Sequence, residues 1–360
     1  MIYLDNQATT PLAPEALEAM LKHLEGPDGT GFGNPHSPHK LGRQAAAAIE
    51  VARERVAALF PSGGRVTFTG GATEALNLAI RGAAGNGPIA CSAIEHSAVL
   101  DTARTAGPEV VLGVDVQGRC DPNQDVPAGT RLIAVMQVNN EIGVVQESDK
   151  WAARAKAAGA LFLVDAVQAY GKMPVASADM IAVSAHKFHG PKGIGALWVR
   201  DGVDLTEQQT GGGQESGLRS GTLSPALIAG FGAAAGLASE RMEEDSAHVA
   251  ALWDRARDHF DGWILNGSDT SRWRGNMNIR KDGLDVARLM SDCRDIMFSA
   301  GSACASGSGK PSRVLKAIGL SDAQAKSSIR LGWSRYTALE EIDEAAKTLK
   351  AAAKEQELWG

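Results

Sequence analysis

Short apolar runs alternate with longer amphipathic segments over residues 1–200 of the chain. Runs of strand length occur at 65–69, 88–92, 110–114, 131–137, 161–164, 180–184 and 195–199. Segments with the apolar spacing of a helix fall before and between them, at 14–25, 39–59, 73–84, 97–106 and 148–158. Because strands that alternate with helices are typical of a doubly wound sheet, this pattern predicts an α/β fold with a mostly parallel, seven-stranded sheet.

The alternation ends at a long alanine-rich segment, which we expect to form one helix over residues 224–260. Beyond it, short strands mix with helices, and a charged helix begins near Leu339. We therefore predict two domains. The large domain comprises residues 15–258, and a smaller α+β domain comprises residues 1–14 and 259–360.

Composition narrows the classes of protein to which this chain can belong. The 360 residues are 44% hydrophobic and carry a net charge of -6, so a large core is expected, and the lack of a long basic run argues against nucleic-acid binding. No apolar stretch has membrane-spanning length and residues 1–10 lack a basic leader, so we expect a cytoplasmic protein. The four cysteines form no CxxC pair, so we expect neither a disulfide framework nor a metal site.

Side chains of the kind used in catalysis follow five of the predicted strands. They are Thr73, His96, Asn140, Asp165, Gln168, Ser184, His186 and Lys187. In open parallel sheets, ligands bind beyond the carboxyl ends of the strands. These side chains are therefore expected to face a single crevice.

Three of these positions suggest one cofactor. The glycine-rich turn before Thr73 leads into a helix, whose N-terminus either attracts a phosphate or is simply capped by the threonine. Asp165 ends an apolar strand and needs a positive partner, either an arginine or a protonated ring nitrogen. Lys187 follows the next strand. A lysine and a buried carboxylate beside a phosphate-binding helix terminus fit pyridoxal 5'-phosphate (PLP), which the lysine would bind covalently.

Ten segments together carry a family resemblance: YLDNQATTP, GTGFGNPHSPH, FTGGATEALNLAI, EHSAVL, VNNEIGVVQ, VDAVQAYGK, SAHKFHGPKGIGALWVR, GGGQESGLRSGT, FSAGSACASG and SSIRLGWSRYT. In this combination the chain resembles the cysteine desulfurases of the NifS/IscS type, over about residues 2–345. These are PLP enzymes of the class V aminotransferase group and have PLP fold type I. The resemblance implies a transferase that converts L-cysteine to L-alanine.

The resemblance also implies a role for each matching position. Lys187 would bind PLP, Asp165 would pair with the ring nitrogen, Gln168 would hydrogen-bond the ring oxygen, and His96 would stack on the ring and transfer protons. The residues implied in phosphate binding are Ala72, Thr73, Ser184 and His186, with Thr222 reaching the phosphate of the other subunit in a homodimer. The residues implied in substrate binding are Asn34, Asn140 and Arg330. Asn140 would also contact the cofactor, and the planar fork of Arg330 suits a carboxylate.

Cys304 lies in the segment SAGSACASGSGKPS, whose small and polar residues are typical of a mobile surface loop. A lone cysteine there is either a chance surface thiol or a nucleophile. The resemblance implies the second: Cys304 would take the substrate sulfur as a persulfide and pass it to an acceptor or scaffold protein for iron–sulfur cluster assembly or another sulfur-containing product. It would also allow Cys304 to share a cluster transiently with such a partner. The other three cysteines are expected to be structural.

Some features leave alternatives open. Ser216 stands where the family usually has arginine, and Gly332 and Ser334 invert its usual order of serine and glycine, which alters the expected carboxylate pocket. The short C-terminal segment leaves the acceptor open between a general scaffold, a nitrogen-fixation scaffold and a tRNA-thiolation partner. Other activities compatible with the residues are those of a selenocysteine lyase or a class V aminotransferase. A non-catalytic sulfur-relay subunit would be expected to lose the cofactor residues, which this chain retains.

Overall fold

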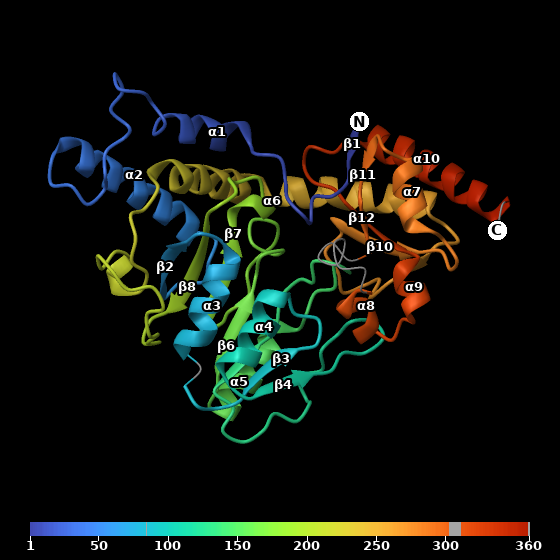
Figure 1. The fold of residues 1–360 in the computed structure, drawn as a ribbon, viewed down its shortest axis with the longest axis horizontal. Helices are drawn as coiled ribbons and strands as arrows, with labels where there is room; N and C mark the ends of the chain where they lie inside the picture. Colours follow the sequence, from blue (N-terminus) through green and yellow to red (C-terminus); the bar gives the residue numbers. More distant parts are fainter. Residues whose placement is uncertain (84, 302–310, 359–360) are drawn as a thin grey trace.

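A computed structural model describes residues 1–83, 85–301 and 311–358, and its central feature is a seven-stranded sheet (Figure 1). The strands lie in the order β2-β8-β7-β6-β5-β3-β4. Their bounds are β2 (Gly64–Thr69), β3 (Ile89–Ser92), β4 (Glu109–Leu112), β5 (Leu132–Ala134), β6 (Leu161–Asp165), β7 (Met180–Ser184) and β8 (Gly195–Arg200). β8 is antiparallel to β2 and β7, and the other pairs are parallel. The predicted α/β fold is confirmed.

Alternate side chains of the strands enter two separate cores. In β7, Ile181 and Val183 belong to one core, and Met180 and Ala182 belong to the other. The first core also receives side chains from α2 (Lys40–Ala57), α5 (Ser148–Ala158) and α6 (Pro225–His259), and the second from α3 (Ala72–Ala83) and α4 (Ser97–Ala106). Because helices cover both faces, the strands are apolar without alternation, as the sequence pattern showed.

Helix ends follow local sequence signals, with small departures from the expected ranges. Ser224 caps α6 by accepting from the Leu227 amide, and Pro225 occupies the first turn, where its missing N–H costs nothing. α1 (Pro14–Leu21) ends earlier than expected. β5 is also shorter than the expected 131–137, although the Gln137 amide beyond it still donates to the Asp165 carbonyl at 3.0 Å.

A second, four-stranded antiparallel sheet lies beyond α6, in the order β12-β13-β10-β9. Its strands are β9 (Ile264–Leu265), β10 (Asn276–Arg280), β12 (Ser299–Ala300) and β13 (Ser328–Gly332). The helices of this part are α7 (Val286–Asp292), α8 (Arg313–Ala317), α9 (Asp322–Lys326) and α10 (Leu339–Leu358). None of the described helices combines the length and apolarity that crossing a membrane requires.

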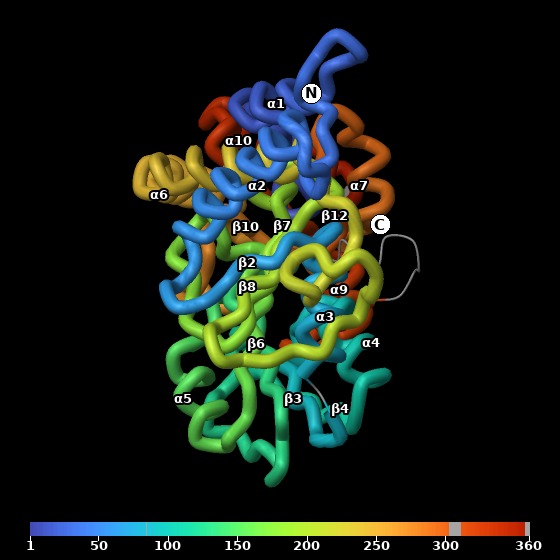
Figure 2. The backbone as a smooth tube through the Cα atoms, turned by 90° about the vertical axis from the view of Figure 1, so that its left-hand side faces the viewer, coloured from blue at the N-terminus to red at the C-terminus, as the bar shows by residue number. Residues whose placement is uncertain are grey.

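The N-terminal strand lies among these C-terminal elements. β1 (Ile2–Tyr3) pairs in parallel with β11 (Ile296–Met297), and Figure 1 shows the N-terminus in the same half of the molecule as α7 and α10. Figure 2 shows α1 near one end of the molecule and β4 near the other. We propose, on the support of the β1–β11 pairing, that residues 1–14 and 259–360 form the smaller domain and residues 15–258 the larger one.

Replacing Gly232 by alanine is expected to destabilise the protein by about 1–3 kcal/mol. A Cβ at Gly232 in α6 would lie 2.6 Å from Cβ and 2.7 Å from Cα of Ala52 in α2, so the two helices would have to separate. Gly236 is the matched control, because a Cβ there would meet only the Arg55 side chain, at 3.8 Å. Gly236→Ala should stabilise the helix slightly. Urea unfolding of both variants checks this, and equal effects would contradict the close approach of α2 and α6.

Candidate active site

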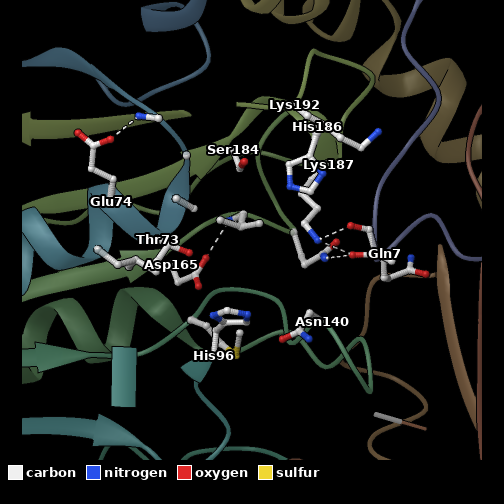
Figure 3. A pocket seen from close by; sticks show the side chains of 18 of the residues that line it. Gln7, Thr73, Glu74, His96, Asn140, Asp165, Ser184, His186, Lys187 and Lys192 are labelled. Carbon is white, nitrogen blue, oxygen red and sulfur yellow. Dashed lines mark hydrogen bonds between the residues drawn. The ribbon is translucent and has the colours of Figure 1, made fainter. Parts of the chain in front are cut away.

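A cavity of about 830 Å³ opens at the carboxyl ends of the parallel strands (Figure 3). Its walls come from the turn before α3, the start of α4, the ends of β6 and β7, and β13 of the second sheet. The structure brings the following predicted residues into this one cavity: Ala72, Thr73, His96, Asn140, Asp165, Gln168, Ser184, His186, Lys187 and Arg330. The expectation of a single crevice therefore agrees with the geometry.

Three predicted residues are not among those that line the cavity. Asn34 is exposed, and its side-chain oxygen accepts from the His36 amide at 2.9 Å. Thr222 is also exposed, a few residues beyond the 3₁₀ turn η2 (Glu215–Gly217). Cys304 lies outside the described residues. The roles implied for these three residues stay predictions.

Lys187 lies in the 3₁₀ turn η1 (Ala185–Lys187) directly after β7. Its Nζ donates to the carbonyl oxygens of Gln7 at 2.7 Å and Ala8 at 2.8 Å (Figure 3). The same N-terminal segment is fixed to the turn by the Thr10 amide, which donates to the His186 carbonyl at 2.9 Å. Two carbonyl acceptors thus hold the amine at the cavity wall. These acceptors could not be predicted from the sequence, because every residue type has a backbone carbonyl.

Asp165 ends β6 and is buried. One of its oxygens accepts from the Val167 amide at 3.0 Å. Burial raises the pKa of this carboxyl group, and the Val167 bond, His96 and Lys187 act in the opposite direction. A carboxylate with this balance stays ionised when a cation binds against it.

His96 faces Asp165 across the cavity in Figure 3, and it caps α4. Its Nδ1 accepts from the Ala98 amide at 3.1 Å, which fixes the plane of the ring. The preceding residue, Glu95, is buried, and its Oε1 accepts from Ser92 Oγ and from the Met136 amide, both at 2.6 Å. Burial above all raises the pKa of Glu95 to about 8. Glu95 therefore joins the ends of β3 and β5 beneath the histidine as a neutral acid.

The opposite end of the cavity is built from the turn before α3. His186 contacts Thr9 Oγ1 through Nδ1 at 3.1 Å, and burial, together with Lys187 and Lys192, lowers its pKa to about 4, so the ring is neutral near pH 7.

Glu74 lines the cavity but was not predicted from the sequence. It accepts from the Gly70 amide at 2.6 Å and pairs with Arg219 at 2.7 Å. This ion pair connects the segment that carries Thr222 to the start of α3.

Arg330 in β13 has a side chain that is only 1% exposed. Its Nη2 pairs with Asp5 Oδ1 at 2.7 Å, and its Nη1 donates to the Asn140 carbonyl at 3.1 Å. Its buried Nε has no hydrogen-bond partner within the described part of the chain. Arg330 lines the cavity, and a guanidinium group has five N–H donors, more than these contacts use, so donors remain for a carboxylate that enters.

Gly332 has a packing reason in this structure. A Cβ at this position would overlap Oε1 of Gln7, whose Nε2 donates to the Gly275 carbonyl at 2.6 Å. The departure from the family pattern at residue 332 therefore makes room for the side chain of Gln7. Ser216 takes the left-handed conformation, with φ 56°, and nothing in the structure explains the serine there.

The donors and acceptors of this cavity fit PLP. An amine and a buried carboxylate line the same cavity, and a glycine-rich turn leads into α3, whose free N–H groups suit a phosphate. A neutral histidine and a serine hydroxyl lie at the same end. Among the described residues, no group of three or more His, Cys, Asp or Glu side chains is arranged to hold a metal ion.

Comparison with known proteins agrees with this geometry. The family model for aminotransferase class-V matches residues 2–345. The chain belongs to this family. It is 42% identical to the cysteine desulfurase IscS of Colwellia psychrerythraea, over 98% of this chain and 92% of that protein. Because the family and these relatives depend on PLP, the predicted cofactor is confirmed.

Two solved structures share the fold over nearly the whole chain. The NifS-like protein from Rickettsia africae has a TM-score of 0.88 at 28% identity, and the match covers 98% of this chain and 99% of that one. SspA in complex with cysteine has a TM-score of 0.82 at 33% identity, over 94% of this chain and 100% of that one. The expected PLP fold type I is therefore confirmed.

Glu95→Gln should flatten the dependence of stability on pH. The pKa of Glu95 is raised in the folded state, so the folded protein holds a proton that the unfolded chain releases above its ordinary pKa. The stability that Glu95 contributes is therefore complete below about pH 4 and is lost as pH rises toward 8, by on the order of a few kcal/mol. Unfolding at several pH values measures the difference. Parallel curves for the two proteins would show that Glu95 is not held protonated.

Proposed function

We propose that this protein is a PLP-dependent cysteine desulfurase, which converts L-cysteine to L-alanine and retains the sulfur as a persulfide on Cys304. The observation that carries the proposal is the convergence of Lys187, Asp165 and Arg330 on one cavity. An amine, a buried carboxylate and a guanidinium group are what an amino-acid enzyme with this cofactor requires. The names of the relatives and the cysteine-bound neighbour support cysteine as the substrate.

Arg330 and Asn140 would orient the substrate. Asp5 and the Asn140 carbonyl fix two sides of the Arg330 guanidinium group, so the substrate carboxylate would meet a preorganised donor. The proposed contribution of Asn34 to the same site would need the segment around residue 34 to approach the cavity. The neutral His186 and the hydroxyls of Ser184 and Thr73, with the backbone at Ala72, would hold the phosphate of the cofactor.

When bound, PLP supplies an electron-accepting ring conjugated with the substrate carbon that loses its proton. Lys187 would hold the cofactor and, once the substrate amine replaces it, would accept the α-proton at Nζ. Asp165 would keep the ring nitrogen protonated, and the desolvated position of its carboxylate strengthens that pairing. His96, fixed by its bond to the Ala98 amide, would cover the ring and move a proton at Nε2.

Cys304 would act as the nucleophile. Its thiolate would attack the substrate sulfur, the carbon–sulfur bond would break, and the carbon, once protonated, would leave as alanine. The residues flanking its segment support this: the Gly301 amide donates to the Ser328 carbonyl at 2.7 Å, and Ser312 Oγ donates to Glu141, beside Asn140. The chain therefore enters and leaves this segment beside the substrate end of the cavity.

The other cysteines suit this role poorly. Cys91, Cys120 and Cys293 are buried, and burial raises the pKa of each thiol. A thiol with a raised pKa supplies little thiolate near neutral pH. This leaves Cys304 as the proposed nucleophile.

The proposed assembly is a cytoplasmic homodimer in which Thr222 of each subunit reaches the cofactor phosphate of the other. The exposure of Thr222 and the Glu74–Arg219 ion pair support this, because Thr222 is presented outward near the start of α3. A sulfur-acceptor or scaffold protein would receive the persulfide, for iron–sulfur assembly or another product, and Cys304 would share a cluster with it transiently. No direct contact with nucleic acid or membrane is proposed.

Cys304→Ala should abolish the formation of sulfide from L-cysteine while leaving the visible absorption of bound PLP intact. The proposed cofactor residues in the cavity lie on or beside α3, α4, β6, β7 and the turn η1, and they do not depend on the thiol. Cys293→Ala is the control, because Cys293 is buried in the second part of the chain. Alanine and sulfide are quantified together in the presence of a thiol reductant. Sulfide release by the Cys304 variant would contradict its assignment, and a yellow wild-type protein that makes neither product would contradict desulfurase activity.

Arg330→Lys should raise KM for L-cysteine by about 10- to 100-fold, because a charge-assisted bond contributes about 1.5–3 kcal/mol and the lysine cannot reproduce the planar fork. Arg280→Lys, on β10 of the same sheet, is the control for a change of charge geometry away from the cavity. Steady-state kinetics measures KM for both variants, and thermal melting checks that a weakened contact with Asp5 has not unfolded the Arg330 variant. An unchanged KM in the folded Arg330 variant would remove it from the substrate site.

A further inference from the structure

Lys172 lies close to the cavity, on the chain segment that follows β6. Its Nζ donates to Oε1 of Gln168 at 2.9 Å, and Gln168 is its one hydrogen-bond partner among the described residues. Gln168 is buried and lines the main cavity. None of the residues proposed to bind the cofactor or the substrate is this lysine.

The contacts of Gln168 settle which way its amide faces. Its Nε2 donates to the Gln7 carbonyl at 3.0 Å, and its Oε1 faces the ammonium group of Lys172. If the amide were reversed, two donors would meet at Lys172 and two acceptors would meet at Gln7. The second hydrogen of Nε2 is therefore available as a donor toward the cavity. The Gln7 carbonyl, which can only accept, and the charged form of Lys172, which can only donate, together set this polarity.

Lys172 also lies near Lys187. Both lysines border a second, small cavity of about 30 Å³, which shares Gln7 and Lys187 with the main one. The Gln7 carbonyl accepts from both Gln168 Nε2 and Lys187 Nζ. Hydrogen bonds therefore link Lys172 to Gln168, Gln168 to the Gln7 carbonyl, and this carbonyl to Lys187. Burial, and next the charge of Lys187, lower the pKa of Lys172 to about 7.

Other charged groups around the small cavity do not neutralise Lys172. Asp245 in α6 pairs with Arg335 at 2.7 Å. His189 is neutral near pH 7, because burial lowers its pKa to about 4. His186, on the same turn as Lys187, is neutral as well. The charges of Lys172 and Lys187 therefore act on each other in a desolvated site, where Lys187 is also coupled to the Asp165 carboxylate.

We propose that Lys172 is a positioning residue for the cofactor: it holds Gln168 as a hydrogen-bond donor to the ring oxygen, and its charge disfavours a second positive charge at Lys187. The proposal rests on the proposed attachment of PLP to Lys187. Both effects favour the deprotonated state of the Lys187 nitrogen when it is bonded to PLP. A donated hydrogen bond stabilises an anionic ring oxygen, and a nearby cation opposes protonation of the nitrogen. Lys172 thus lowers the pH at which the PLP-bonded nitrogen of Lys187 loses its proton.

Lys172→Met tests the proposal in protein loaded with PLP. The visible absorption band is followed as a function of pH, and its midpoint should move upward by about one pH unit, because the charge and one of the two contacts that orient Gln168 are lost. Lys172→Arg, which keeps a donor and a charge, should keep a midpoint near that of the wild type. Lys192→Met is the matched control, because Lys192 also lines the main cavity but is exposed, so solvent screens its charge.

A folded Lys172→Met protein with the wild-type midpoint would overturn the proposal, and so would an equal shift in Lys192→Met. Melting and circular dichroism establish folding. If the methionine variant does not fold, Lys172→Gln removes the charge with a polar side chain and should show the same upward shift. Failure of the proposed function gives a different result, because Lys187→Ala would then keep the visible band. If only the present proposal fails, the band depends on Lys187 but its midpoint does not change when Lys172 is replaced.

Discussion

The parallel pairing of β3, β5, β6 and β7 brings the carboxyl ends of four neighbouring strands to one edge of the sheet. Polar residues placed directly after these strands meet there, although they are far apart in sequence. β8 runs back antiparallel to β7, so the turn that carries Lys187 is short and begins and ends at the same edge. Rigid strands, covered by helices on both faces, thus hold the amine and the carboxylate in a fixed relation, as the proposed attachment of PLP to Lys187 requires.

The N-terminal segment joins the two sheets across this edge. The Gly332 amide donates to the Leu4 carbonyl at 2.8 Å, and Asp5 pairs with Arg330, so residues 4 and 5 are held against β13 of the second sheet. Gln7 and Ala8 supply the acceptors for Lys187, so the next residues are held against the turn that follows β7 of the first sheet. One short stretch of chain therefore contacts both Lys187 and Arg330, which stand at the proposed cofactor end and the proposed substrate end of the cavity. A change in this stretch would act on both ends together.

The site concentrates ionisable groups where water is scarce. Burial raises the pKa of Asp165, Glu95 and Glu141 and lowers the pKa of Lys172 and His186. Each of these groups is thereby pushed toward its neutral form, and the charge that it carries is decided by its immediate neighbours. A ligand that brings a phosphate, a ring cation and a carboxylate would supply the missing partners. The same desolvated charges would then both bind the ligand and stabilise the charges that develop during the reaction.

The sequence by itself determined the sheet strands, the main helices and the residues that follow the strands, because those signals are local: apolar runs, capping residues and glycine turns. Asp165, Lys187 and His96 could be predicted for that reason. Tertiary structure alone decided that Gln7 and Ala8 hold the lysine, that Glu74 pairs with Arg219, that Lys172 orients Gln168, and that Gly332 leaves room for Gln7. Most of these contacts join segments far apart in the chain, and they use backbone carbonyls, empty space or the direction of an amide. None of these features leaves a pattern in the order of residues.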